Sequence, residues 1–198
     1  MSKPQFINEL SIPAIAAPMF LISGPELVIE CCKNGIVGTF PALNQRTSEG
    51  FEEWLIEIKT ELDKFEKETG KKAAPYGVNL IVHNTNPRVQ SDLMLCVKHK
   101  VPIIITSLGA VSQLVDAVHS YGGLVFHDVI KKRHAEKAAE AGVDGLILVA
   151  AGAGVMQAHF IQYHSLLRLR NFSKKQFYYQ DVFQTEETSL QLNKWVLI

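Results

Sequence analysis

The stretch VFHDVIKKRHAEKAAEAGVDGLILVAA, residues 125–151, decides the fold. An apolar run over Leu124–Val129 predicts a strand, and the charged, alanine-rich run Lys132–Ala141 predicts a helix that Gly142 ends. A second apolar run, Gly145–Ala151, predicts another strand. A helix between two neighbouring strands is the usual parallel crossover, so the stretch predicts one strand–helix–strand unit of a parallel sheet.

The same alternation runs back towards the N-terminus. It predicts four earlier strands, at Ile12–Met19, Ile36–Phe40, Tyr76–Val82 and Pro102–Ser107. It predicts helices at Gly24–Asn34, Ser48–Glu68, Arg88–Lys100 and Ala110–Tyr121. Near-continuous apolar strands of this kind are covered on both faces. Two architectures fit the repeat, a doubly wound open sheet and a (β/α)8 barrel.

Composition excludes several classes of protein. The 198 residues carry no net charge and are 20% charged, which disfavours nucleic-acid and membrane-surface partners. No apolar run approaches the ~20 residues of a membrane span, and the start has no apolar segment typical of a signal peptide. The three cysteines lack CxxC spacing, which favours reduced thiols and a cytoplasmic protein. No metal-binding pattern occurs, and the histidines read mostly as surface residues.

Polar residues recur where the predicted strands end. Asn79 lies in the third strand, the pair Thr106-Ser107 ends the fourth, and the pair His127-Asp128 lies late in the fifth. The carboxyl ends of parallel strands meet at one edge, and in a barrel that edge holds the active site. The run Gly152-Ala153-Gly154 lacks the full dinucleotide fingerprint, so it favours a small-residue loop that a flat or phosphorylated ligand can approach closely.

Composition changes at residue 155. All thirteen glycines lie between Gly24 and Gly154, and residues 155–198 contain neither Gly nor Pro. We therefore divide the chain into 1–154 and a tail, 155–198. The tail is expected to be irregular or helical, with an amphipathic helix at Tyr163–Phe172, and to add no seventh and eighth barrel units.

Three segments resemble the nitronate monooxygenase family, also called 2-nitropropane dioxygenase-like flavoproteins: Ile15–Met19 (IAAPM), Gly77–Leu80 (GVNL) and Val125–Gly154. The resemblance covers about residues 8–154, about half of a family barrel. It implies an α/β fold, a partial (β/α)8 TIM barrel of about six βα units that binds FMN. Such enzymes oxidise alkyl nitronates with dioxygen, giving a carbonyl compound and nitrite. The family also includes flavin-dependent enoyl-acyl-carrier-protein (enoyl-ACP) reductases.

The resemblance also implies where the cofactor would lie. It places these residues at the FMN: Ala17, Pro18, Met19, Asn79, Thr106, Ser107, Asp128, Gly152 and Gly154. Some family members carry Lys in place of Asp128. The family histidine that takes a proton from neutral nitroalkanes would follow Gly154 in a Gly-His pair, where this chain has Val155 and then Met156. No family catalytic residue is therefore intact, and His159 has nothing to place it at a strand end.

A shifted reading frame would explain the change at Val155. The codons for residues 155–160 (VMQAHF), read from one nucleotide earlier with G in that place, can encode Gly-His-Ala-Gly-Thr-Phe. This is the continuation that the resemblance implies. A natural frameshift and a sequence error both remain open.

The resemblance implies, as the activity of the parent family, FMN-dependent oxidation of small nitronates or nitroalkanes with dioxygen, with no nucleic acid or membrane partner. This chain lacks the last units of the barrel, so we expect it to bind FMN poorly and its activity to be impaired. A flavin-dependent enoyl-ACP reductase, an inactive fragment, and a phosphate-binding barrel of other chemistry are the alternatives. Nicotinamide consumption distinguishes the reductase from the monooxygenase.

Overall fold

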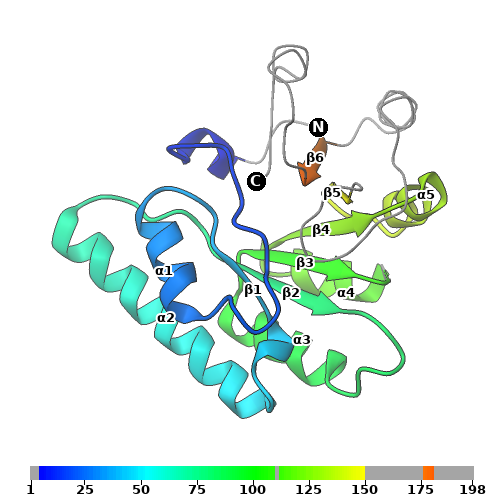
Figure 1. Ribbon diagram of the computed structural model, residues 1–198, viewed down its shortest axis with the longest axis horizontal. Coiled ribbons are helices and arrows are strands. Elements are labelled where there is room, and N and C mark those ends of the chain that lie inside the picture. Colours follow the sequence, from blue (N-terminus) through cyan, green and yellow to red (C-terminus); the bar gives the residue numbers. More distant parts are fainter. Residues whose placement is uncertain (1–4, 110–111, 150–175, 181–198) are drawn as a thin grey trace.

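The computed structural model describes residues 5–109, 112–149 and 176–180 (Figure 1). Helices and strands alternate along the chain. In order they are η1 (Gln5–Glu9), α1 (Pro25–Lys33), β1 (Thr39–Pro41), η2 (Ala42–Asn44), α2 (Ser48–Thr69), β2 (Gly77–Ile81), α3 (Val89–His99), β3 (Ile103–Ser107), α4 (Ser112–His119), β4 (Leu124–Val129), α5 (Lys132–Glu140), β5 (Gly145–Val149) and β6 (Gln176–Gln180).

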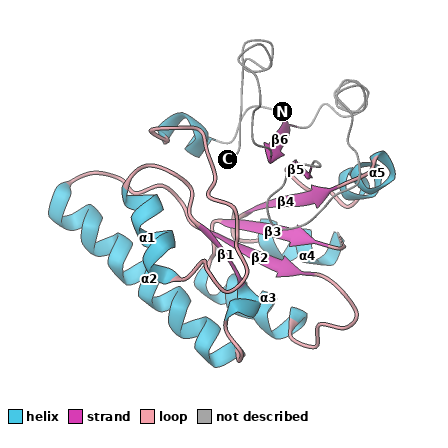
Figure 2. Cartoon of the chain, in the orientation of Figure 1, coloured by secondary structure: helices cyan, strands magenta, loops and turns pink. Residues whose placement is uncertain are grey.

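The sheet is parallel, and its strand order is β1-β2-β3-β4-β5-β6 (Figure 2). Each strand therefore pairs with the next one along the chain. A doubly wound sheet reverses its order at a switch point, whereas a barrel wall does not. The strand order favours the barrel over the open sheet, and the fold is a partial (β/α)8 barrel.

The first predicted strand, Ile12–Met19, is much shorter than expected. Only a parallel bridge between Ile15 and Val37 forms, with the Ala16 N–H donating to the Val37 carbonyl at 2.8 Å. Pro13 and Pro18 have no N–H to donate to a ladder, which explains why the pairing stops on both sides of the bridge. The second predicted strand also forms later than expected, at Thr39–Pro41 rather than Ile36–Phe40.

The tail contributes a strand that the sequence analysis did not predict. Residues Gln176–Gln180 (QFYYQ) pair with β5 in parallel, from Gly145 opposite Gln176 to Val149 opposite Gln180. Aromatic residues favour strands, so this run has the composition for it. The expectation of an irregular or helical tail is therefore corrected for these five residues. The expected helix at Tyr163–Phe172 lies outside the described residues.

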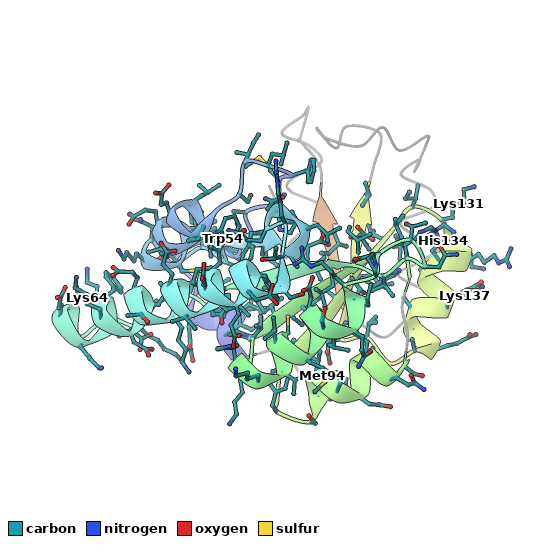
Figure 3. All side chains as sticks on the ribbon, turned by 90° about the horizontal axis from the view of Figure 1, so that it is seen from below. Trp54, Lys64, Met94, Lys131, His134 and Lys137 are labelled. Atoms are coloured by element: carbon teal, nitrogen blue, oxygen red, sulfur yellow. The ribbon has the colours of Figure 1, made fainter. Side chains whose placement is uncertain are left out.

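Helix ends follow the signals in the sequence. The Thr47 side chain caps α2 by accepting from the Gly50 N–H at 3.0 Å, and Gly70 ends the helix with a left-handed φ of 68°. The long surface of α2 carries Lys64, and Met94 lies on the surface of α3 (Figure 3). None of the helices in residues 5–109 and 112–149 is long and apolar enough to cross a membrane.

The two faces of the sheet bury different clusters. The outer face packs against the helices, and its cluster includes Phe40, Phe51, Leu55, Ile104 and Leu146. The inner face, which corresponds to the barrel interior, carries a smaller cluster of Ile7, Ile15, Val37, Ile103, Ile105, Phe126 and Ile147. Successive residues of a strand alternate between these faces. This alternation decides which strand-end residues can meet inside the barrel.

Candidate functional site

Strand alternation separates the polar residues at the carboxyl ends into two groups. Ser107 lies two residues after Ile105, and Asp128 two after Phe126, so both share the inner face with those apolar residues. Asn79, opposite Ile105 in the register, lies on the inner face as well. Thr106 and His127 lie opposite each other and face the helices.

Asn79, Ser107 and Asp128 form a hydrogen-bond relay across β2, β3 and β4. The Asn79 amide Nδ2 donates to the Ser107 Oγ at 2.7 Å, and that hydroxyl donates to the Asp128 Oδ2 at 2.6 Å. Asn79 and Ser107 are only 5% and 3% exposed, whereas Asp128 is partly exposed. The carboxylate is therefore the open end of a buried polar chain.

The environment of Asp128 brings its titration close to neutral pH. Burial raises its pKa to about 6, while hydrogen bonds from Ser107 and from the backbone N–H groups of Leu108 and Asp128 act in the opposite direction. A carboxyl with such a pKa is able to accept a proton in its charged form and to return it in its neutral form. The relay can therefore take part in proton transfer at the inner edge of the sheet.

Thr106 and His127 form a separate pair on the outer face. The Thr106 Oγ1 and the His127 Nδ1 are 2.7 Å apart, and Thr106 also donates to the Phe126 carbonyl at 3.3 Å. Burial lowers the pKa of His127 to about 4, so its ring is neutral at pH 7. The structure therefore brings Ser107 and Asp128 together but directs Thr106 away from them.

The Ala17-Pro18-Met19 loop reaches the same end of the sheet, because Ile15 runs parallel to β1 and the loop follows it. Asn44, at the end of η2, holds this loop in place. Its Nδ2 donates to the carbonyls of Met19 (3.0 Å) and Ser23 (2.8 Å), and its Oδ1 accepts from the Leu21 N–H at 3.0 Å. The sequence analysis missed Asn44, since its role depends on contacts more than twenty residues away.

Two leucines at this edge have left-handed backbones. Leu21, in the loop, has φ 61°, and Leu108, directly after β3, has φ 66°. They are 76% and 65% exposed. A non-glycine residue in this region costs about 1–3 kcal/mol, and such strain gathers at functional sites. Phe20 and Ile22 are also exposed. We call Phe20, Leu21, Ile22 and Leu108 the apolar rim, because the first three follow the Ile15 bridge and Leu108 follows β3, both at the carboxyl ends of the strands.

Two predicted cofactor residues, Gly152 and Gly154, lie outside the described residues, and their roles stay predictions. Gly109, which the sequence analysis did not single out, does lie within them. A Cβ there would come within 2.7 Å of the Val82 carbonyl oxygen. This position therefore requires glycine for the close approach of the chain after β3 to the end of β2.

Comparison with solved structures supports the barrel. A FabK (M276A) mutant from Thermotoga maritima superposes with a TM-score of 0.79 at 16% identity, covering 99% of this chain and 64% of that one. A nitroalkane oxidase from Streptomyces ansochromogenes gives 0.71 at 16% identity, with coverages of 87% and 59%. The enoyl reductase domain of MlnA from Bacillus amyloliquefaciens gives 0.74 at 18%, with coverages of 97% and 54%.

This chain thus spans less than two thirds of the length of each of these structures. No protein-family description matches it by sequence, and no curated protein sequence matches it. At such low identity the likeness establishes the fold alone, which is the TIM-barrel fold that the family resemblance implies.

Proposed function

We propose that the protein is an FMN-dependent oxidoreductase that oxidises alkyl nitronates with dioxygen to a carbonyl compound and nitrite. The observation that carries the proposal is the Asn79–Ser107–Asp128 relay, which lies at the strand ends where barrel enzymes hold their ligands. The nitroalkane oxidase from Streptomyces ansochromogenes shares the fold, which supports a nitro compound as the substrate.

The residues at this edge fit a flavin ring, which presents both carbonyl groups and an N–H along one side. The Asn79 amide nitrogen donates to the Ser107 hydroxyl and to the Ile105 carbonyl, and we assign its Oδ1 to the ligand. That oxygen is an acceptor for a ring N–H. The Ala17-Pro18-Met19 loop offers an apolar surface beside it, held in place by Asn44.

When bound, FMN supplies the redox chemistry, taking electrons from the nitronate and passing them to dioxygen. The chain's own residues bind and orient the cofactor and the substrate. Asn79 and Ser107 hold the polar end of the site, and the apolar rim of Phe20, Leu21, Ile22 and Leu108 suits the alkyl part of the substrate. Preformed nitronates are the favoured substrate, because they need no proton removed and this chain has Val155-Met156 where the resemblance implies Gly-His.

Oxygen consumption tests the proposal. The 198-residue protein is mixed with FMN, and oxygen uptake is measured with a preformed alkyl nitronate. At saturating FMN we expect slow nitronate-dependent oxygen uptake that Asn79→Ala lowers further. Phosphate in barrels is often bound after strands seven and eight, so we expect weak FMN binding. A protein that binds no FMN at millimolar concentration would contradict the proposal.

An enoyl-ACP reductase is the second candidate. It is favoured by the fold shared with FabK and with the MlnA enoyl reductase domain. The two activities differ in one co-substrate, because the reductase consumes a nicotinamide and the monooxygenase does not. Loss of NADH or NADPH absorbance with an enoyl thioester, together with no nitronate-dependent oxygen uptake, would favour the reductase.

The third candidate is a non-catalytic fragment with the boundary 1–154 and 155–198, produced by a shifted reading frame. Genomic DNA around the codon for Gly154 tests it. We expect a single insertion or deletion to open a frame of about 100 further residues, which the size of a barrel requires. A protein made from that frame is the matched control for the oxygen assay.

We also propose that the protein is located in the cytoplasm and that its binding partners are small molecules. Cys32 and Cys96 are free thiols with fully buried side chains, which suits a reducing compartment. Fractionation of cells that produce the protein, followed by thiol labelling, checks this placement.

A further inference from the structure

We propose that Asp128 is the base that removes the α-proton from a neutral nitroalkane, so that the site accepts nitroalkanes as well as nitronates. The inference rests on the proposed function for its substrate class. It assigns to a strand-end carboxylate the proton transfer that the resemblance assigns to a histidine just after Gly154, where this chain has Val155 and Met156.

The position of the carboxylate carries the inference. Asp128 lies on the inner face with Asn79 and Ser107, at the edge where the Leu108 backbone is strained. It is the partly exposed member of the relay, whereas the other two are buried. The Ser107 hydroxyl fixes one of its oxygens at 2.6 Å, so the group is held at the edge where a ligand enters a barrel.

The pKa of Asp128 is determined by burial and hydrogen bonding. Ser107 faces it from β3, and Ile147 is its register partner on β5. His127 points to the opposite face, where it interacts with Thr106 and His134. No charge among the described residues contributes to the raised pKa of about 6. Asp128 is therefore mostly ionised at pH 7 and basic enough to accept a proton.

The step is a simple proton transfer. The α-C–H bond of the nitroalkane breaks, and its proton forms an O–H bond with the Asp128 carboxylate. The electron pair moves into the nitro group, which becomes a nitronate. No oxidant is needed for this step. Because the transfer is reversible, it also exchanges the α-hydrogen with solvent before any oxidation occurs.

Hydrogen exchange tests the base without flavin or dioxygen. The protein without added FMN is incubated with nitroethane in deuterated buffer, and loss of the α-proton signal is followed by NMR. We expect exchange faster than in buffer alone, with a rate that rises about tenfold from pH 5 to pH 7. Asp128→Asn should lower the protein-dependent rate about 100-fold or more.

Asp116→Asn is the matched control, because Asp116 is an exposed residue of α4 and the change is chemically the same. It should leave the exchange rate as in the unchanged protein. The carboxyl pKa of Asp128, measured by ¹³C NMR on the unchanged protein, gives a second reading that needs no variant; we expect it near 6.

Exchange no faster than in buffer, equal rates for D128N and D116N, or a carboxyl pKa near its ordinary value would each overturn the inference. These outcomes are separate from those of the proposed function. Nitronate-dependent oxygen uptake without hydrogen exchange would leave the oxidase proposal standing and remove only the role of Asp128.

Discussion

The two faces of the sheet differ in what their polar residues do. On the outer face, Thr106 and His127 are hydrogen-bonded to each other beneath the helices, and burial keeps the ring of His127 neutral. On the inner face, Ser107 and Asp128 are also bonded, but the carboxylate is partly exposed at the edge. Adjacent residues of the same two strands thus serve stability on one face and, in our proposal, chemistry on the other.

The largest expected effect is on the apolar clusters. Phe40 packs on the outer face against Phe51 and Trp54, with ring centroids 6.0 and 5.7 Å away. We expect Phe40→Ala to lower the free energy of unfolding by about 3–5 kcal/mol. Phe126→Ala on the inner face should cost less, because its described cluster is smaller and can collapse more easily.

Urea unfolding of the two variants measures the difference. A greater loss for Phe126→Ala than for Phe40→Ala would reverse the order of the two faces. The inner cluster would then be the main source of stability.

The next effect is on how the free energy of unfolding changes with pH. His127 on the outer face and Asp128 on the inner face should change it in opposite directions. His127 has a pKa of about 4 in the folded state and an ordinary value of 6.5, so its contribution is lost as pH falls from 6.5 towards 4. Asp128 has a folded pKa of about 6 and an ordinary value of 3.8, so it destabilises the fold as pH rises from 4 to 6. In the unchanged protein these contributions oppose each other.

Variants separate the two contributions. In the Asp128→Asn variant only the His127 contribution remains, so the free energy of unfolding should increase as the pH is raised from 4 to 6.5. The increase should be on the order of 1–3 kcal/mol, at about 1.4 kcal/mol per pKa unit. With His127→Gln, stability should instead fall between pH 4 and 6. Urea midpoints across this range measure both slopes. Slopes of the same sign in the two variants would contradict the assignment of the residues to different environments.

Much of the fold was predictable from local patterns. Helices and strands between Ser48 and Val149 lie within a few residues of their expected bounds, because apolar strands and capped helices carry clear signals. The order of the strands in the sheet was not predictable from local patterns, since both candidate architectures use the same repeat. Only pairing between strands far apart in the sequence distinguishes them.

The site was predictable in its residues but not in its grouping. Alternation implies that Thr106 and Ser107 face opposite ways, yet both faces of a covered strand are apolar, so the sequence does not say which faces inward. Asn44 and the left-handed backbones of Leu21 and Leu108 had no local signal, because leucine is not a residue expected at positive φ. They depend on tertiary contacts.

A smaller effect is expected at the hydroxyl between the two inner-face partners. Ser107→Ala removes the hydrogen bond that stabilises the charged form of Asp128, so the pKa of Asp128 should rise above about 6. It also takes one acceptor from the buried Asn79 amide, which should cost about 1–2 kcal/mol. Thr106→Val, one residue away on the outer face, should leave the carboxyl pKa unchanged. ¹³C NMR titration compares them, and equal shifts would show that the faces are not independent.

The smallest effect is expected in the helix layer, at the start of α5. Its first turn has no acidic residue, and Arg133 lies there among basic neighbours. Figure 3 shows the N-cap residue Lys131 together with His134 and Lys137 of the helix. Positive charge is unfavourable at a helix N-terminus and favourable at the C-terminus. Arg133→Glu should therefore raise the free energy of unfolding by about 0.3–1 kcal/mol, and Lys137→Glu, in the last turn, should lower it by a similar amount.

Urea midpoints at low and high salt measure this pair of variants, and added salt should shrink both effects. If Arg133→Glu destabilises the protein instead, the arginine makes a favourable contact that outweighs the helix dipole. A polar contact of α5 would then contribute to stability beyond the packing of this helix on the outer face. The difference between the two faces would be smaller beside β4.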